Sequence, residues 1–253
     1  MINAADLAAW RQLPLIFTRA KNTRDYLQGK GVPAEAVVPI YDPCDTSIYR
    51  PLDKRLCKQK LGFSDNDLVL VHHGILHPNK GNAQIIEELP DLLKTCPNLR
   101  YLLIGDGLEM PRIRNLIREK NLENFVKLTG WLPKPEDVNN ALNAGDIGLV
   151  MRIGLETDHF AMTGNLIHNL ACGLPVLAAR LRSIAEVITD GQNGFLFDPG
   201  NMDEFKTKLL TLANNPGLRQ EFGQKGLAVV RELFDMRTVA HQTIAALQQL
   251  CRE

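Results

Sequence analysis

One segment of the chain combines residue types that suit a phosphate-binding turn. The polar turn Thr163 to Asn165 begins a short predicted helix, 164–171, and Gly173 and Pro175 end it before an apolar strand. Backbone N–H groups at a helix start carry partial positive charge, so they stabilise a phosphate without a metal ion. The alternative is that Gly173 and Pro175 simply end a buried helix.

The same helix carries two further polar side chains. Asn165 and His168 are three residues apart, so a helix places them on one face. We therefore expect both side chains to point toward the ligand that the turn binds.

A second candidate loop follows the predicted strand 68–73. Gly74 allows backbone to come close to a ligand, and the Lys80 ammonium can meet a phosphate charge. The P-loop pattern Gly-x-x-x-x-Gly-Lys-Ser/Thr does not occur, so a nucleoside-triphosphatase site of that type is not supported.

Two weaker signals follow the next two predicted strands. Gly105 and Gly107 form a Gly-x-Gly pattern, which alone is more often a simple turn than a nucleotide site. Trp131 and Leu132 offer a ring and backbone groups to a flat partner, although Trp131 could equally pack in the core.

These loops need a parallel sheet to position them, and the sequence predicts one. Short β-rich runs alternate with helical patterns, which is typical of an α/β fold whose parallel sheet has helices on both faces. Ligands of such sheets bind beyond the carboxyl ends of the strands. The predicted strands are 15–18, 37–40, 68–73, 100–104, 126–128, 146–151, 175–178 and 194–197. The predicted helices are 23–29, 54–60, 83–94, 109–120, 136–143, 164–171, 183–188, 202–213, 217–233 and 236–250.

The last predicted helix has a recognisable start and one apolar stripe. Asp235 suits its N-cap, and Val239, Ile244, Leu247 and Leu250 share a face, which predicts a packed surface.

Composition excludes several classes of protein. The 253 residues contain 29 Lys plus Arg and 29 Asp plus Glu, so net charge gives no attraction to nucleic acid. The five cysteines lie far apart and form no Cys-x-x-Cys pair, which argues against a disulfide framework and a zinc site. No apolar run approaches the ~20 residues of a membrane span. We expect a cytoplasmic protein, with peripheral contact at the inner face of the membrane left open.

The order of the motifs resembles the carboxy-terminal half of the group 1 family of retaining nucleotide-sugar glycosyltransferases, which have the GT-B fold. Residues 74–81 resemble that family's Gly-Arg-Leu-x-x-x-Lys-Gly, 105–107 its Gly-x-Gly, and 168–176 its Glu-Ala-Met-Ala-Cys-Gly-Leu-Pro-Val. Downstream, residues 186–194 resemble Glu-Ile-Val-x-Asp-Gly-x-x-Gly. Upstream, residues 18–27 are similar to the last strand and helix of the amino-terminal domain, and residues 45–51 to the interdomain linker.

The resemblance implies a site and a donor. Lys80 would contact the donor diphosphate, the turn at 163–165 would present amides to it, and Gly130 to Leu132 would hold the base. Glu186 would face the sugar or phosphate, although a glutamate on a short helix is by default solvated. The donor would be a UDP-, GDP- or ADP-sugar, without a metal or other cofactor, and the catalytic residues stay unknown. The candidate nucleotide-sugar-binding residues are Gly74, Lys80, Gly105, Gly107, Trp131, Leu132, Thr163, Gly164, Asn165, His168 and Glu186.

Three positions depart from the family pattern. Ile75 replaces an arginine, His168 replaces the glutamate that binds the ribose hydroxyls, and Asn165 replaces a lysine of some relatives. Each lost charged hydrogen bond costs roughly 1.5 to 3 kcal/mol, about tenfold to more than a hundredfold in affinity. Donor binding is expected to weaken accordingly.

The resemblance also implies three regions. Residues 1–50 would be a remnant of the acceptor-binding domain with the linker, 51–233 the nucleotide-sugar-binding domain, and 234–253 a helix crossing back to the first region. Most of the acceptor domain is missing, so we expect exposed apolar surface and self-association or a partner chain. The chain would be a fragment, one subunit of a two-chain transferase, or a degenerate copy.

The favoured hypothesis is the donor-binding half of a hexosyltransferase for polysaccharide biosynthesis, acting with retention on a glycan or glycolipid acceptor. The alternative is a degenerate, non-catalytic binding or scaffold module, which Ile75, Asn165 and His168 favour. A third hypothesis is a sugar epimerase or phosphorylase of the same two-domain architecture. The sequence patterns at residues 18–50 and 164–176 disfavour it.

Overall fold

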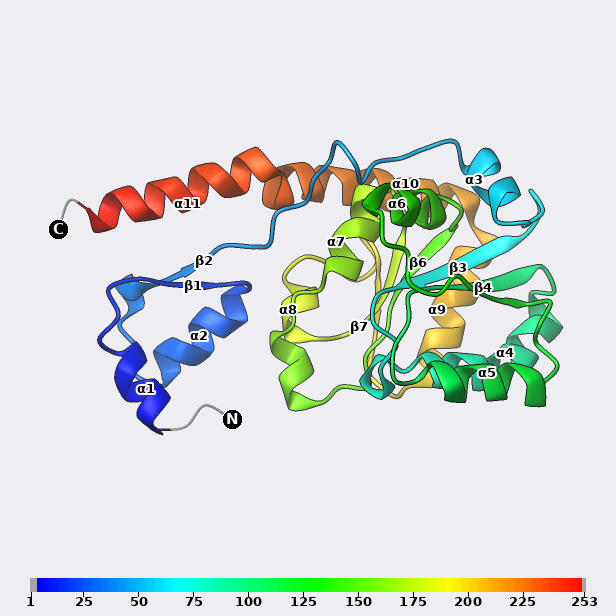
Figure 1. Cartoon of the computed structure of the whole chain (residues 1–253), viewed down its shortest axis with the longest axis horizontal. Helices are drawn as coiled ribbons and strands as arrows, with labels where there is room; N and C mark the ends of the chain where they lie inside the picture. The colour runs from blue at the N-terminus through cyan, green and yellow to red at the C-terminus, as the bar shows by residue number, and fades with distance from the viewer. Residues whose placement is uncertain (1–3, 252–253) are drawn as a thin grey trace.

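The computed structural model describes residues 4–251, and its largest element is a six-stranded parallel sheet (Figure 1). The order of the strands is β5-β4-β3-β6-β7-β8. Their bounds are β3 Leu68–His73, β4 Leu99–Ile104, β5 Val126–Leu128, β6 Ile147–Val150, β7 Val176–Ala179 and β8 Phe195–Phe197. The predicted Rossmann-like α/β class is confirmed, and every strand predicted for this sheet is present.

Helices cover both faces of this sheet because its strands are apolar on both sides. Leu70 of β3 shares a core cluster with Ile86 of α4, whereas the next residue, Val71, shares a different cluster with Leu142 of α6. Successive side chains of a strand point to opposite faces, so the two clusters lie on the two sides. The helices are α3 Lys54–Lys60, α4 Asn82–Thr95, α5 Met110–Glu119, α6 Pro135–Asn143, α7 Gly164–Ala171, α8 Arg182–Ala185, α9 Met202–Asn214 and α10 Pro216–Val229.

The direction of strand order changes at β3. The chain runs outward from β3 through β4 to β5 and then returns to β6 on the other side of β3. The loops that follow β3 and β6 therefore diverge, which leaves a crevice at the carboxyl ends of these strands. The first loop contains the 3₁₀ turn η2 (Pro78–Lys80), and the second contains η3 (Glu156–Phe160) before α7. This topology brings Lys80 near the start of α7.

The amino-terminal residues form a small separate unit. Strands β1 (Ile16–Thr18) and β2 (Val37–Pro39) pair in parallel, with Ile16 opposite Val37. Both strands were predicted. A small core of Leu27, Val32 and Val37 holds this sheet. The helices of the unit are α1 Ala4–Trp10, which was not predicted, α2 Lys21–Gly29 and the 3₁₀ turn η1 Ala34–Ala36.

The carboxy-terminal helix lies along the small unit (Figure 1). The predicted helix 217–233 is instead α10 followed by a π-helical turn, η4 (Val230–Phe234), and α11 (Met236–Leu250) follows. The Asp235 side chain accepts a hydrogen bond from the Arg237 N–H, which confirms the predicted N-cap. The predicted packed stripe is wrong, because Val239 is buried but Ile244 and Leu247 are exposed.

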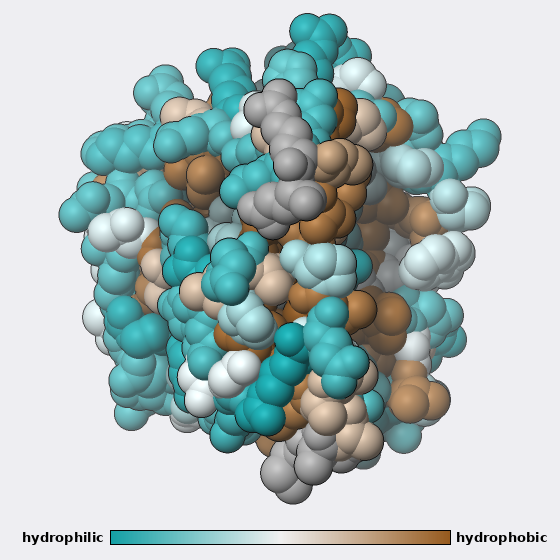
Figure 2. Space-filling view, turned by 90° about the vertical axis from the view of Figure 1, so that its left-hand side faces the viewer, coloured by the Kyte–Doolittle hydropathy of each residue, from teal (hydrophilic) through white to brown (hydrophobic). Residues whose placement is uncertain are grey.

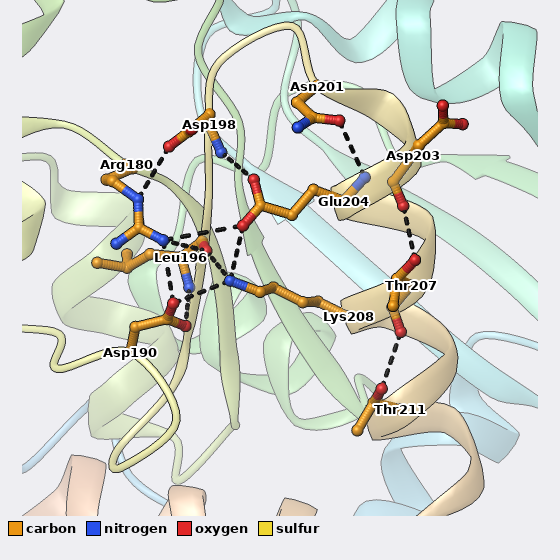
Figure 3. Close-up of polar contacts among 10 residues, drawn as sticks. All are labelled: Arg180, Asp190, Leu196, Asp198, Asn201, Asp203, Glu204, Thr207, Lys208 and Thr211. Carbon is orange, nitrogen blue, oxygen red and sulfur yellow. Dashed lines mark hydrogen bonds and ion pairs between the residues drawn. The ribbon is translucent and has the colours of Figure 1, made fainter.

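An ion-pair network fixes the outer edge of the large sheet (Figure 3). Asp190 accepts hydrogen bonds from Leu196 N at 2.9 Å, Arg180 Nη2 at 3.0 Å and Lys208 Nζ at 2.9 Å. Lys208 also pairs with Glu204 at 2.9 Å. These contacts connect β8 to α9, so Asp190 of the motif-like segment 186–194 acts here as a structural anchor.

Candidate functional site

Two adjoining pockets open at the crevice between the diverging loops. The Lys80 pocket has a volume of about 510 Å³, and the Trp131 pocket has about 330 Å³. They share His73, Gly74 and Ile75, so they form two compartments of one site. The other residues lining the Lys80 pocket are His77, Asn79, Lys80, Arg152, Thr163, Gly164 and Asn165. The others lining the Trp131 pocket include Tyr49, Ile104, Gly105, Trp131, Leu132, Pro133, Pro135 and Val138.

The Lys80 ammonium is a half-buried cation without a partner. It makes no hydrogen bond and no ion pair with any of residues 4–251. Burial, followed by the nearby positive charge of Arg152, lowers the pKa of Lys80 to about 8. A cation held in this way lacks both full hydration and a counter-ion, so an incoming anion would stabilise it.

Arg152 differs from Lys80 because its charge is already compensated. Its Nη1 lies 2.9 Å from the Asp158 carboxylate, and both side chains are largely buried. Asp158 also accepts hydrogen bonds from Leu155 N at 3.0 Å and Asn79 Nδ2 at 3.3 Å. The pair therefore holds η3 against the loop after β3, and Lys80 supplies the uncompensated charge of the pocket.

The start of α7 offers backbone donors to the same pocket. The Thr163 side chain caps the helix by accepting from Leu166 N at 3.4 Å. The N–H groups of Thr163, Gly164 and Asn165 donate to no group within the described chain. These three residues line the Lys80 pocket.

The Asn165 side chain does not point into the pocket as a ligand group. Its Nδ2 donates to Leu149 O at 3.0 Å, and its Oδ1 accepts from Asn169 Nδ2 at 2.7 Å. The predicted shared polar face of Asn165 and His168 is therefore wrong for Asn165, whose amide joins α7 to β6. The backbone of Asn165 remains part of the pocket wall.

His168 lines neither pocket and instead packs in an aromatic cluster with His73 and Tyr49, which do line them. Its Nδ1 lies 2.9 Å from His73 Nε2, and its ring stacks on Tyr49 with centroids 3.7 Å apart. Burial lowers the pKa of His168 to about 4 and, together with the His168 charge, lowers that of His73 to about 3. Both imidazoles are consequently neutral at pH 7.

The two glycines of the Gly-x-Gly pattern lie in different places. A Cβ on Gly105 would lie 2.0 Å from Gly74 O, and one on Gly107 would lie 2.2 Å from Leu76 O, so both residues permit close packing of the two loops. Gly105 lines the Trp131 pocket. Gly107 instead lines a separate shallow depression beside Arg114 and Arg118.

Trp131 and Leu132 both line the Trp131 pocket. Trp131 is 68 % exposed, which excludes the alternative that it packs in the core. Ile75 is 62 % exposed and lines both pockets at the position of the family's arginine. The compartment is thus mostly apolar.

Glu186 lies outside both pockets. Its carboxylate accepts hydrogen bonds from Lys21 N at 2.8 Å, Asn22 N at 2.6 Å and Tyr41 Oη at 3.0 Å. It therefore caps α2, whose own N-cap residue Ala20 provides no side-chain acceptor. Glu186 joins the small unit to the large sheet, and its carboxylate is bonded to α2 and Tyr41 outside the two pockets.

Sequence reasoning did not include His73, Arg152 and Tyr49 among the candidate site residues. The sequence does carry a signal for His73 and Arg152, because each lies at or just beyond the carboxyl end of a central strand. Tyr49 carried no such signal, since it lies in the connecting segment before α3.

Two other findings bear on the type of site. Within residues 4–251, no group of three or more His, Cys, Asp or Glu side chains could hold a metal ion. Across that same range, every helix is too short or too polar to cross a membrane.

A family model described as glycosyl transferases group 1 matches residues 53–228. The EpsD protein of Bacillus subtilis, named as a glycosyltransferase, is 26 % identical over 224 residues, which cover 86 % of this chain and 57 % of EpsD. The N-acetyl-alpha-D-glucosaminyl L-malate synthase of Bacillus anthracis is 24 % identical, covering 83 % of this chain and 53 % of the synthase. The chain therefore spans little more than half the length of these curated relatives.

Solved structures show the same fold. HepE of Anabaena, crystallised in complex with UDP, superposes with a TM-score of 0.85 and 24 % identity, covering 97 % of this chain and 68 % of HepE.

Proposed function

The chain belongs to the group 1 glycosyl transferases, and we propose that it binds the nucleotide-sugar donor of a hexosyl transfer to a glycan or glycolipid acceptor, with retention. The observation that carries this proposal is the partnerless Lys80 ammonium beside the open start of α7. A diphosphate supplies the negative charge that the Lys80 ammonium lacks and the hydrogen-bond acceptors that the N–H groups at the start of α7 lack.

The two compartments fit the two ends of a nucleoside diphosphate. The Lys80 pocket receives the diphosphate, and the Trp131 pocket receives the base. During transfer the departing diphosphate gains negative charge, and Lys80 with the amides of Gly164 and Asn165 stabilises it without a metal ion. HepE, whose structures contain UDP and UDP-glucose, supports this donor class by its similar fold.

A second candidate is a non-catalytic module that binds a nucleotide without transferring sugar. Among the described residues, no carboxylate lines either pocket. Ile75 and the neutral His168 further reduce the polar contacts available to a donor. This candidate keeps the binding site and predicts binding without turnover.

Isothermal titration with UDP, GDP and ADP tests the binding function. We expect at least one of the three to bind in the micromolar to millimolar range, because Lys80 and the start of α7 bind the diphosphate without the arginine that the family pattern has at Ile75. A folded protein that binds none of them would contradict the proposal. A transfer or donor-hydrolysis assay with the matching sugar nucleotide then separates the transferase from the binding module.

An apolar groove supports the proposal that another polypeptide supplies the acceptor-binding part of the transferase. The groove lies between the β1–β2 sheet and α11, has a volume of about 580 Å³ and is lined in part by Phe17, Met236 and Ile244, all exposed. Figure 2 views this end of the molecule and shows hydrophobic residues gathered along a band. A two-stranded sheet is marginal alone, so further strands would stabilise it.

The groove gives a prediction for the purified chain. We expect concentration-dependent self-association, because exposed apolar side chains find one another when their partner is missing. Replacing Ile244, which lines the groove, by aspartate should shift the protein toward the monomer, whereas Glu232→Asp at an exposed position outside the groove should not. Multi-angle light scattering measures the mass, and a concentration-independent monomer of the unchanged protein would contradict this prediction.

A further inference from the structure

A buried carboxylate lies behind the Lys80 pocket and joins two of its walls. Asp158 of η3 is 2 % exposed and lines neither pocket. Its Oδ1 accepts from Arg152 Nη1 at 2.9 Å and from Asn79 Nδ2 at 3.3 Å, and these donors belong to the loops after β6 and β3. The backbones of the same two loops are joined by a hydrogen bond from Ile153 N to Asn79 O at 3.1 Å. Asp158 is therefore fixed in place behind the anion site.

Arg152 has more donors than Asp158 occupies. A guanidinium has five N–H donors, and within residues 4–251 the Arg152 side chain makes a hydrogen bond only from Nη1 to Asp158. Its Nε and Nη2 are not enclosed, and the side chain lines the Lys80 pocket. Arg152 is thus a second cation of the pocket, and Asp158 cancels its charge.

The charge that the pocket offers to an anion follows from these side chains. Lys80 and Arg152 each contribute a positive charge and Asp158 a negative one, so one positive charge remains. A nucleoside diphosphate carries more negative charge than this. The attraction between the site and its ligand is therefore weaker than two free cations would give.

We propose that Asp158 limits the affinity of the anion site, because by pairing with Arg152 it keeps the second cation from the bound diphosphate. The inference rests on the proposed function, since the diphosphate is part of the nucleotide that this site is proposed to bind. A transferase must release its nucleoside diphosphate product after each transfer, and slow release limits turnover. A carboxylate fixed behind the site keeps the product from binding too tightly.

Three variants test this role by isothermal titration at pH 6.5 with UDP, or with GDP or ADP if that base binds, and with inorganic pyrophosphate. Asp158→Asn keeps the shape and removes the charge, so it should bind about tenfold more tightly than the unchanged protein. Arg152→Met leaves the carboxylate without its guanidinium beside Lys80 and should bind about tenfold more weakly. The double variant has the original net charge and should lie between the two.

Asp67→Asn is the matched control for the loss of a paired carboxylate. Asp67 lies 2.9 Å from Arg100, and both side chains are largely buried, but neither lines the two pockets. Its replacement should leave the affinity for the same ligands within about twofold.

The pH profile separates an effect of charge from a merely structural one. Burial and the Arg152 charge lower the pKa of Lys80 to about 8, and the Asp158 charge opposes them. Asp158→Asn should therefore lower this pKa further and move the loss of affinity to lower pH. The other titratable side chains near Lys80, which this variant leaves in place, are His72, His73 and His77.

The outcomes separate the two proposals. A folded Asp158→Asn protein that binds no more tightly than the unchanged protein overturns the affinity-limiting role and leaves nucleotide binding intact. Tighter pyrophosphate binding by Asp158→Asn, with no binding of any nucleoside diphosphate, contradicts the proposed function and supports the role of Asp158. Binding of neither ligand by any of the proteins overturns both. If Asp158→Asn does not fold, as judged by circular dichroism, equal affinities of Arg152→Met and the double variant overturn the inference.

Discussion

Replacing Lys80 by methionine is expected to weaken nucleoside diphosphate binding about 100-fold. Lys80 provides the partnerless positive charge of its pocket, whereas Arg152 is already paired with Asp158. Charge-assisted hydrogen bonds to phosphate contribute roughly 1.5 to 3 kcal/mol each, which corresponds to about tenfold to more than a hundredfold. Methionine keeps most of the side-chain volume, so the change removes charge and little packing.

Isothermal titration measures this effect, and Lys127→Met is the matched control. Lys127 is an exposed lysine of β5 away from both pockets, so its replacement should leave the affinity within about twofold. A Lys80→Met protein that is folded and binds with unchanged affinity would show that the diphosphate lies elsewhere.

The lowered pKa of Lys80 adds a pH dependence to the same binding reaction. An anion favours the protonated amine, so binding raises the Lys80 pKa above its value of about 8 in the free protein. Affinity should therefore be full below about pH 8 and fall by up to tenfold per pH unit above it. Lys80→Arg keeps its charge over this range and should give a flatter profile.

The large sheet was predictable because its strands are short buried runs between clear turn signals. β3, β5, α3, α7 and α11 have the predicted bounds, and the other strands differ by one or two residues. Such runs are apolar on both faces and leave few alternative assignments. Helix α1 was missed because Ala4 to Trp10 carries no capping signal, and the π-helical turn η4 continues a pattern that looks like ordinary helix.

The compartments were predictable from strand order, but the roles of single side chains were not. Topology places Lys80, Thr163 and Trp131 at the same end of one sheet, whatever their side chains contact. Glu186 and Asn165 have partners that no local pattern reveals, since Glu186 bonds Lys21 from 165 positions away. The His73–His168 contact likewise joins residues 95 positions apart.

Three buried histidines are expected to make the fold labile in mild acid. Burial lowers the pKa of His72 and His73 to about 3 and that of His168 to about 4. Unfolded histidine titrates near 6.5, so below that pH the unfolded chain binds protons that the folded chain excludes. Stability is therefore full above about pH 6.5 and falls as the pH drops below it.

The size of this loss follows from proton linkage. At pH 5.5 each of the three histidines costs about 1.4 kcal/mol, and together they cost roughly 4 kcal/mol of unfolding free energy. Asp146 acts at lower pH, because Lys54 and Lys58 outweigh the effect of burial and hold its pKa below the usual value. Burial raises the pKa of Glu109, which acts in the opposite direction by adding stability as the pH falls. The loss between pH 6.5 and 5.5 therefore comes from the histidines.

Urea denaturation at pH 7.5 and 5.5 measures the difference directly. His168→Gln removes one of the three groups and should reduce the pH-dependent loss by about 1.4 kcal/mol, whatever its effect at pH 7.5. His241→Gln, at an exposed position of α11, should leave the loss unchanged. Unfolding free energies that agree within about 1 kcal/mol at the two pH values would mean that these rings accept protons in the folded state, and would contradict the prediction.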